Sequence, residues 1–206
     1  MGSPLKVVHY LNQFFGGVGS EEKANLPTQV REGAVGPGRA LQQLFENDAL
    51  VVATILCGDN YFNEEKSQAQ QAVTKVLNDL KPDVVVAGPA FNSGRYGLAC
   101  VSVCKVARNL GIPALTGMHP DNPSVLQINQ QIIVVATGPS TADMQEALNI
   151  MSHLSLKLGR GEALGPARQE GYLPTGIRKM VLREEPGHKR AVDMLAAKLK
   201  GEPFQT

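Results

Sequence analysis

Almost continuously apolar stretches of strand length alternate, over most of the chain, with stretches of helical periodicity. The strand-like runs are residues 6–12, 49–56, 83–88, 113–117 and 131–138. Because these runs are rich in Val and Ile and show little polar alternation, they predict strands that are buried on both faces. Between them, apolar residues recur every three to four positions, which is typical of amphipathic helices.

The predicted helices cover residues 36–47, 64–80 and 94–110. A fourth helix carries the apolar stripe Met144, Ala147, Leu148, Met151, Leu154 and Leu158, and a final helix carries Val192, Leu195, Ala196 and Leu199. Residues that favour the N-cap position precede three of them: Asn63, then Asn92 or Ser93, then Ser140 or Thr141. Strands that alternate with helices indicate an α/β fold, with a doubly wound, mainly parallel sheet and helices on both faces.

Two regions are predicted from this pattern. Residues 5–158 form the α/β domain, with a site at the carboxyl ends of its strands. In residues 159–187 Gly and Pro recur, and only 178–183 looks extended. We therefore expect 159–206 to be an irregular arm followed by a terminal helix, packed on the domain or on a partner.

Composition and charge exclude several classes of function. The 206 residues include 20 Lys and Arg against 19 Asp and Glu, with no basic tract, so we expect neither nucleic acid nor a membrane surface as partner. The apolar runs are too short to span a bilayer. Three cysteines form an odd set rather than a disulfide framework, which favours the cytoplasm. Without Trp, an aromatic cage for a quaternary ammonium group is hard to build from this chain alone.

Gly, Pro, Asn and Asp are concentrated in the segments that follow the predicted strands. These segments are 13–23, 57–63, 88–97, 117–123 and 137–140. The connections at the other end of the strands, NDLKPD and NLGIP, are plain by comparison. Ligands of open parallel α/β sheets bind beyond the carboxyl ends of the strands. The asymmetry therefore predicts one composite site at that edge.

Three residues in these loops carry alternative interpretations. Cys57 ends a predicted strand and is either a packed thiol or a reactive nucleophile. Asp59 either binds a ligand amine or makes a local turn. Arg95 lies in the first turn of a predicted helix, where a cation is slightly unfavourable. It either grips an external carboxylate or pairs with Asp59 or Glu64.

The candidate site residues form one set at this edge. The candidate catalytic residue is Cys57, and the candidate backbone and anion sites are Gly58, Gly88, Gly94 and Gly138. The candidate substrate-binding residues are Asp59, Asn60, Tyr61, Phe91, Asn92, Arg95, Tyr96 and Met118.

No metal site and no nucleotide site are predicted. The pair Cys100 and Cys104 lacks the further Cys or His ligands of a zinc site and is expected to pack in the core, as is His9. His119 is the one histidine expected near the site. GGVG at 16–19 lacks the spacing of a dinucleotide fingerprint, and no Walker motif is present.

Several long segments resemble a known family. VVHYLNQFF, REGAVGPGRAL, CGDNYFNE and GPAFNSGRYGLACVSVCK occur in this order, followed by GMHPDNP, EGYLPTG and RAVDMLAAKL. They resemble the amino-terminal half of the component B selenoproteins of glycine, sarcosine and betaine reductases, over nearly the whole chain.

The resemblance implies a role in a multisubunit complex. In that family, component B selects the substrate, and a separate subunit carries a pyruvoyl group that captures the amine. A selenocysteine in the carboxyl-terminal half attacks the α-carbon, and the resulting group passes to selenoprotein A. This chain has no U-x-x-C motif. The resemblance therefore implies a selenocysteine supplied from outside the chain, no cofactor bound by the chain, and no complete reaction by the chain alone.

Taken together, these observations predict the substrate-pocket portion of an amino-acid reductase component B, an oxidoreductase component that acts in reductive C–N cleavage. Its expected partners are the pyruvoyl-containing subunit, selenoprotein A and a small amino-acid-like substrate, and a homo-oligomer is a further option. Arg95 would hold the substrate carboxylate, and Asp59 and Asn60 would orient its amine. The alternatives are a non-catalytic binding or scaffold module of the same family, and a stand-alone enzyme that uses Cys57.

Overall fold

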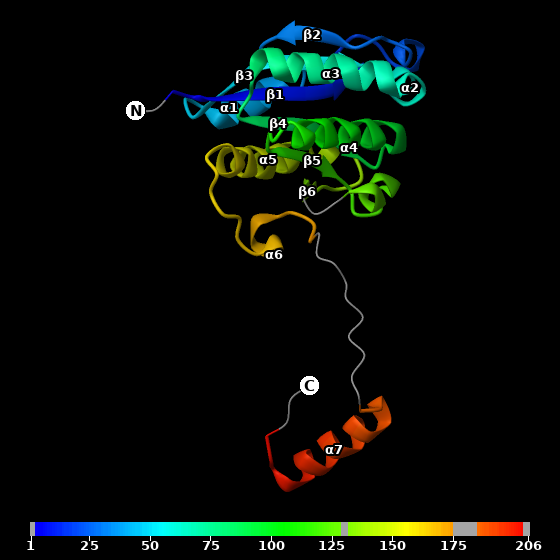
Figure 1. Cartoon of the computed structure of the whole chain (residues 1–206), viewed down its shortest axis with the longest axis vertical. Helices are drawn as coiled ribbons and strands as arrows, with labels where there is room; N and C mark the ends of the chain where they lie inside the picture. The colour runs from blue at the N-terminus through cyan, green and yellow to red at the C-terminus, as the bar shows by residue number, and fades with distance from the viewer. Residues whose placement is uncertain (1–2, 129–131, 175–184, 204–206) are drawn as a thin grey trace. The chain divides into compact units, whose positions relative to one another are not determined.

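The computed structural model describes residues 3–128, 132–174 and 185–203 and confirms the predicted α/β class (Figure 1). Its six-stranded sheet runs β2 (Gln29–Glu32), β3 (Ala49–Cys57), β1 (Leu5–Asn12), β4 (Val84–Phe91), β5 (Ala114–Met118) and β6 (Ile133–Ala136). All neighbouring strands are parallel except β2, which pairs with β3 in the antiparallel direction.

The strand order creates a crevice between β1 and β4. From β1 the chain passes to β3 on one side, and it then crosses to β4 on the other side of β1. Doubly wound sheets bind ligands at the point where the direction of winding changes in this way. The two strands are in register from Val7–Val84 to Tyr10–Ala87, so their loops leave the sheet at the same edge.

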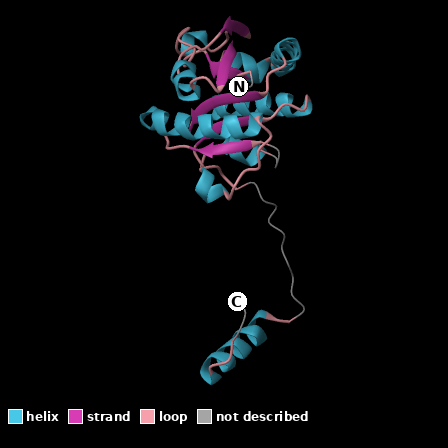
Figure 2. Cartoon of the chain, turned by 90° about the vertical axis from the view of Figure 1, so that its left-hand side faces the viewer, coloured by secondary structure: helices cyan, strands magenta, loops and turns pink. Residues whose placement is uncertain are grey.

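Helices cover both faces of the sheet, as Figure 2 shows. On one face, α3 (Lys66–Leu80) and α4 (Gly94–Asn109) bury apolar stripes against the strands, and Cys100 and Cys104 belong to that core, as predicted. On the other face, α1 (Gly38–Phe45) and α5 (Met144–Gly159) do the same. Each sheet face thus contributes its alternate Val, Ile and Leu side chains to a separate apolar core.

The structure departs from the predicted elements in the region after β3. A short helix, α2 (Asp59–Glu64), starts directly after Gly58, and α3 begins only at Lys66. The prediction that Asn63 caps a helix over 64–80 is therefore wrong. Asn63 lies inside α2, where its amide donates a hydrogen bond to the backbone carbonyl of Asp59 (2.7 Å) instead of accepting one.

Further short elements lie outside the predicted pattern. β2 has only one apolar residue, Val30, which is 48% exposed, so it carries no buried-strand pattern. The 3₁₀ helices are η1 (Glu21–Lys23), η2 (Pro123–Gln127) and η3 (Thr141–Asp143), and α6 (Ala167–Glu170) follows α5. The expected cap residue Ser140 precedes η3 and accepts a hydrogen bond from the Ala142 backbone.

The chain divides into two compact units, residues 1–175 and 176–206. In the first, the segment after α6 covers the outer edge of the sheet: Ala136 donates to the Gly171 carbonyl (3.1 Å), and Leu173 donates to that of Val134 (2.7 Å). The second unit contains α7 (Gly187–Lys200), which bears the periodic apolar residues of the predicted final helix. The stretch 178–183, predicted to be extended, lies outside the described residues.

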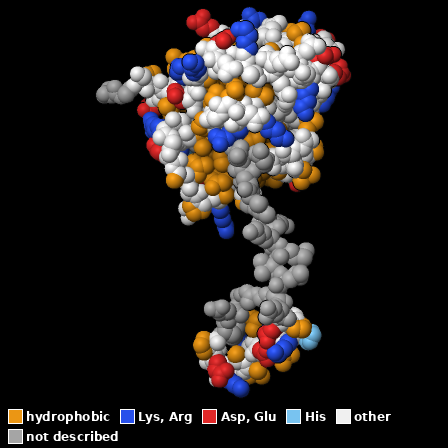
Figure 3. All heavy atoms as spheres, viewed as in Figure 1, with side chains coloured by type: hydrophobic (Ala, Val, Ile, Leu, Met, Phe, Trp, Pro, Cys, Tyr) orange, Lys and Arg blue, Asp and Glu red, His pale blue; other side chains and the backbone are white. Residues whose placement is uncertain are grey.

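Charges of both signs are scattered over the face shown in Figure 3. This distribution agrees with the net charge of +1 and with the absence of a basic tract from the sequence. In the described parts of the chain, no helix combines the length and the apolarity needed to cross a membrane. The same residues contain no group of three or more His, Cys, Asp or Glu side chains placed to hold a metal ion.

Candidate substrate site

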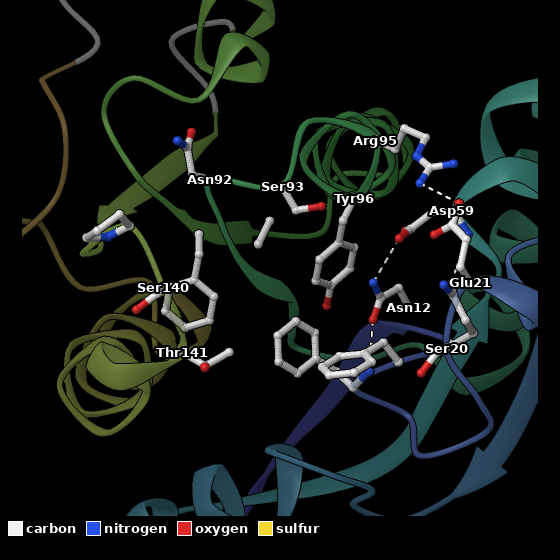
Figure 4. A pocket seen from close by; sticks show the side chains of 16 residues that line it. Asn12, Ser20, Glu21, Asp59, Asn92, Ser93, Arg95, Tyr96, Ser140 and Thr141 are labelled. Atoms are coloured by element: carbon white, nitrogen blue, oxygen red, sulfur yellow. Dashed lines mark hydrogen bonds and ion pairs between the residues drawn. The ribbon is translucent and has the colours of Figure 1, made fainter.

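A pocket of about 440 Å³ lies at the carboxyl edge of the sheet, over the crevice between β1 and β4. Its walls come from four segments that are far apart in sequence: the loop after β1, the start of α2, the turn from β4 into α4, and residues 139–141 after β6. Figure 4 shows Asp59 and Asn12 facing one another on one side, with Ser140 and Thr141 across the pocket. A cavity therefore lies at the edge where the sequence predicts a composite site.

Gly58 allows the turn from β3 into α2 to pack against the loop after β1. A Cβ atom at this position would lie 2.2 Å from the carbonyl oxygen of Ala24. The Gly58 N–H donates to the carbonyl of Leu26 (2.8 Å), which fixes the approach of the two segments. Gly58 therefore acts through close packing, and it places Asp59 at the first position of α2.

Asp59 is held by the two residues at the end of β1. The amide of Asn12 donates to Asp59 Oδ2 (2.9 Å), and the Asp59 N–H donates to Gln13 Oε1 (3.0 Å). The other carboxylate oxygen, Oδ1, has no hydrogen-bond partner among the described residues, although Asp59 is only 6% exposed. Burial raises the pKa of this carboxyl, against the effects of the Asn12 hydrogen bond and the Arg95 charge. The pocket thus contains a buried acidic group with an unused acceptor.

Arg95 joins three loops at the mouth of the pocket. Its Nη2 lies 2.7 Å from Glu21 Oε1, on η1 in the loop after β1, and its Nη1 donates to Asn60 Oδ1 on α2. Arg95 itself belongs to the first turn of α4. Both expected pairings of Arg95, with Asp59 and with Glu64, are replaced by the pair with Glu21. We call the group Glu21, Asn60 and Arg95 the mouth clasp.

The turn from β4 into α4 is tied down by the loop after β5. Phe91 adopts a left-handed backbone conformation with φ 49°, which is uncommon for a residue with a side chain. Its carbonyl accepts hydrogen bonds from Asn122 Nδ2 (2.9 Å) and from the His119 N–H (2.9 Å). Asn122 also donates to the carbonyl of Ser93, just before α4. The N-terminus of a 16-residue helix is thereby fixed at the pocket wall.

Four aromatic side chains line the pocket: Phe14, Phe15, Phe91 and Tyr96. The ring of Phe15 lies at centroid distances of 5.4 Å from Phe14, 6.2 Å from Phe91 and 5.7 Å from Tyr96, so the four form one cluster. Phe14 is 56% exposed, while Tyr96 is fully buried and its hydroxyl has no partner among the described residues. The cavity therefore has an apolar wall next to its acidic group.

The structure brings together some of the sequence-predicted site residues and leaves others apart. Those that line the pocket are Asp59, Phe91, Asn92, Arg95 and Tyr96, and Asn60 reaches it through Arg95. The remaining candidates lie outside the lining. Met118 is in the apolar core, and the hydroxyl of Tyr61 donates to Gln68 (3.2 Å).

Gly88, Gly94 and Gly138, which were predicted as backbone or anion sites, make contacts within the protein. The carbonyl of Gly88 bonds to His9 Nε2 (2.7 Å), and that of Gly94 accepts from the Ser124 hydroxyl (3.2 Å). A Cβ atom at Gly138 would lie 1.9 Å from Asp143 Oδ2, so the loop after β6 also requires close packing.

Cys57 is enclosed at the end of β3. Its thiol donates to the carbonyl of Leu26 (3.8 Å) and accepts a hydrogen bond from Thr28 (3.4 Å). Burial raises the pKa of this thiol to about 11, so at neutral pH it is almost entirely protonated. The geometry supports packing at this position more than nucleophilic chemistry.

Sequence reasoning did not single out Asn12 and Gln13, whose side chains form hydrogen bonds with Asp59. Asn12 ends the first predicted strand, and Gln13 begins the predicted loop that follows it. The sign that could have pointed to them is a pair of polar residues directly after the apolar residues of a buried strand. Asn122 was part of a predicted site loop, but only the fold shows that its side chain bonds to the β4–α4 turn.

The structure is an α/β domain with a cavity at the switch point of its sheet, the position where sheets of this kind bind ligands. A family model for glycine/sarcosine/betaine reductase selenoprotein B matches residues 4–206, and the chain belongs to this family.

Relatives in the same family are similar over almost the whole chain. The sarcosine reductase complex component B subunit beta of Peptoclostridium acidaminophilum is 49% identical over 203 residues, which are 98% of this chain and 47% of the relative. The glycine reductase complex component B subunit gamma of Carboxydothermus hydrogenoformans is 50% identical over the same shares. The betaine reductase complex component B subunit beta of Peptoclostridium acidaminophilum is 40% identical, over 98% of this chain and 46% of the relative. The chain thus spans about half the length of these curated relatives.

Proposed function

We propose that the pocket binds the zwitterionic amino-acid substrate of a glycine, sarcosine or betaine reductase component B. The observation that carries the proposal is the buried Asp59 carboxylate, whose Oδ1 has no partner among the described residues and which lines the same cavity as Arg95. A substrate ammonium group next to Asp59 would balance the charge of that carboxylate, and a substrate carboxylate near Arg95 would balance the charge of the guanidinium. The relatives are named as subunits of sarcosine, glycine and betaine reductase complexes.

The carboxylate end has two sources of stabilisation. Arg95 offers a planar guanidinium that can bind a carboxylate through two hydrogen bonds. The first turn of α4 adds backbone N–H groups and the positive end of the helix dipole. Because Arg95 is already paired with Glu21, a substrate carboxylate has to share or displace that partner.

The size of the cavity agrees with a small ligand. Its volume of about 440 Å³ lies in the lower part of the range found for small-molecule sites. The buried Asp59 and the aromatic cluster supply a desolvated end, where a charge pair is stronger than in water. Substrate binding and orientation are therefore the tasks that we assign to this chain.

The reductive cleavage itself would belong to the whole complex. On the resemblance described above, a pyruvoyl group on a partner subunit and a selenocysteine outside this chain would supply the chemistry at the C–N bond, and selenoprotein A would accept the product group. This chain would hold the substrate and dock those partners. The alternative of a binding or scaffold module without a substrate remains, and the test below separates the two.

The test is the Arg95→Ala variant in the complete reductase complex. We expect the KM for the amino-acid substrate to rise by at least about tenfold, since a charge-assisted hydrogen bond to the carboxylate is lost. Arg31→Ala, on the exposed strand β2, is the matched control and should leave the KM unchanged. An unchanged KM for Arg95→Ala would count against this function and favour the scaffold alternative.

A further inference from the structure

We propose that the Asp59 end of this pocket selects N-methylated ammonium groups over a primary ammonium group. The proposal rests on the proposed function and names the substrate class within it. Similarity alone does not make this choice, because the relatives named for sarcosine and for glycine reductase are 49% and 50% identical to the chain. The choice follows from three features of the cavity: its charge, its hydrogen-bond acceptors and its aromatic wall.

The first feature is an acidic group that needs a cation. Asp59 is buried, with only 6% of its surface exposed, and the Asn12 amide donates a hydrogen bond to only one of its two carboxylate oxygens. A buried carboxylate without a full set of partners is costly, so a cationic ligand is favoured at Oδ1. The nearby cation Arg95 bonds to Glu21 and Asn60, and it forms no ion pair with Asp59 among the described residues.

The second feature is a shortage of hydrogen-bond acceptors around Asp59. A primary ammonium group brings three N–H donors, each of which needs an acceptor when it is buried. Asn12 Oδ1 already accepts from the Phe15 N–H (2.9 Å), and Gln13 Oε1 already accepts from the Asp59 N–H (3.0 Å). Asp59 Oδ1 has no partner among the described residues, and the buried Tyr96 hydroxyl is a second unpartnered oxygen on the pocket wall. These two oxygens can accept two of the three N–H donors, so a buried primary ammonium group leaves a donor unsatisfied that a methyl group would remove.

The third feature is the aromatic wall. The chain has six Phe and four Tyr, and four of these residues line this one cavity. The cluster around Phe15 offers aromatic surface to an alkylated cation, through burial of its methyl groups and through cation–π attraction. Because the chain has no Trp, an aromatic site for an alkylated ammonium group seemed hard to build. In the fold, Phe and Tyr side chains from the loop after β1 and from the turn into α4 come together and form the aromatic wall.

The three features act in the same direction. Methylation spreads the positive charge, removes N–H donors and adds apolar surface, and the pocket supplies a carboxylate, few free acceptors and aromatic rings. We therefore expect affinity to increase with the number of methyl groups on the amino-acid nitrogen. The strongest contrast is between glycine and its trimethylated form, betaine.

The test is calorimetric titration of the chain with glycine, sarcosine, N,N-dimethylglycine and betaine. We expect the Kd of betaine to be at least about tenfold lower than that of glycine, with the other two between them. 3,3-Dimethylbutanoate has the shape of betaine but a carbon atom in place of the ammonium nitrogen, and it should bind at least about tenfold more weakly than betaine, because it lacks the positive charge that Asp59 compensates.

Two variants locate the effect. Asp59→Asn keeps the shape of the side chain and should raise the Kd of betaine by at least about tenfold, while Asp79→Asn, an exposed acid at the far end of α3, should not change it. Phe15→Leu should reduce the ratio of the glycine and betaine Kd values severalfold. Circular dichroism checks that each variant is folded.

The outcomes separate this inference from the function on which it rests. Binding of all four amino acids with equal Kd values, or tightest binding of glycine, overturns the selectivity and leaves the zwitterion site standing, provided that Asp59→Asn still weakens binding. Equal binding of betaine and 3,3-dimethylbutanoate also overturns it. Failure of all four to bind overturns both the selectivity and the proposed function.

Discussion

His9 should make the stability of this protein strongly dependent on pH in mildly acidic solution. The side chain is fully buried in β1, where Nε2 bonds to the carbonyl oxygen of Gly88 (2.7 Å). Nδ1 has no partner among the described residues, and the backbone of Gly38 closes over it: a Cβ atom there would lie 2.7 Å from Nδ1. Burial lowers the pKa of His9 from 6.5 to about 4, because the imidazolium would be desolvated without a counter-charge.

The size of the effect follows from this shift. Between pH 6.5 and about pH 4 the unfolded chain binds a proton at this histidine and the folded chain does not. The free energy of unfolding therefore falls as the pH falls through this window, and the contribution is fully present only above pH 6.5. At 1.36 kcal/mol per pKa unit, the loss amounts to about 3 kcal/mol by pH 4. Asp59, whose pKa is raised by burial, works in the opposite direction, so the histidine must be isolated by mutation.

Urea unfolding followed by far-UV circular dichroism measures this contribution. We compare the chain with His9→Gln, whose amide can still donate to Gly88 and does not titrate, at pH 7.5, 6.0, 5.0 and 4.5. The drop in the free energy of unfolding from pH 7.5 to 4.5 should be smaller in His9→Gln by about 2–3 kcal/mol. His188→Gln, on the exposed face of α7, serves as control and should retain the full drop. An equal drop in the His9→Gln variant would refute the assignment.

Further predictions concern the site and its frame. The three thiols, all buried, should fail to react with Ellman's reagent in the folded chain at pH 8 and react fully in urea; rapid reaction of Cys57 would revive its candidacy as nucleophile. Gly58→Ala should lower the free energy of unfolding by about 1–3 kcal/mol, because its Cβ would meet the backbone of Ala24; an unchanged urea midpoint would show that this turn is not tightly packed. Glu21→Gln should free Arg95 and lower the Kd of betaine severalfold; weaker binding would show that Glu21 positions Arg95 instead of competing for it.

The strands that the sequence predicted well are those whose burial is complete. β1, β3 and β4 lie within a few residues of the predicted runs, since a strand covered on both faces needs apolar side chains at nearly every position. β2 is an exposed edge strand, and the four residues QVRE carry no such requirement. The boundary at Asn63 was misjudged because the residue types that cap helices also form hydrogen bonds inside short ones.

The edge of the sheet that holds the cavity could be predicted, but the contacts inside the cavity could not. Loop composition at the carboxyl edge was sufficient to select Asp59 and Arg95, since all such loops meet at one edge. The pair between Arg95 and Glu21 joins residues 74 positions apart, and nothing in either local sequence favours it over a pair with Glu64. The hydrogen bonds of Asn12 and Gln13 to Asp59 likewise depend on the register between β1 and β3.

The mouth clasp has a mechanical consequence for the loops that it joins. Because one guanidinium contacts both η1 and α2, either segment can move away from α4 only if its own contact with Arg95 breaks. Motion at the mouth is then concerted: the three segments move as one body or the clasp breaks. In energetic terms, the effects of substituting Glu21 and Asn60 should not add, since either change alters how the same Arg95 side chain is held. Any partner that touches one of these loops would therefore reach the whole mouth of the pocket.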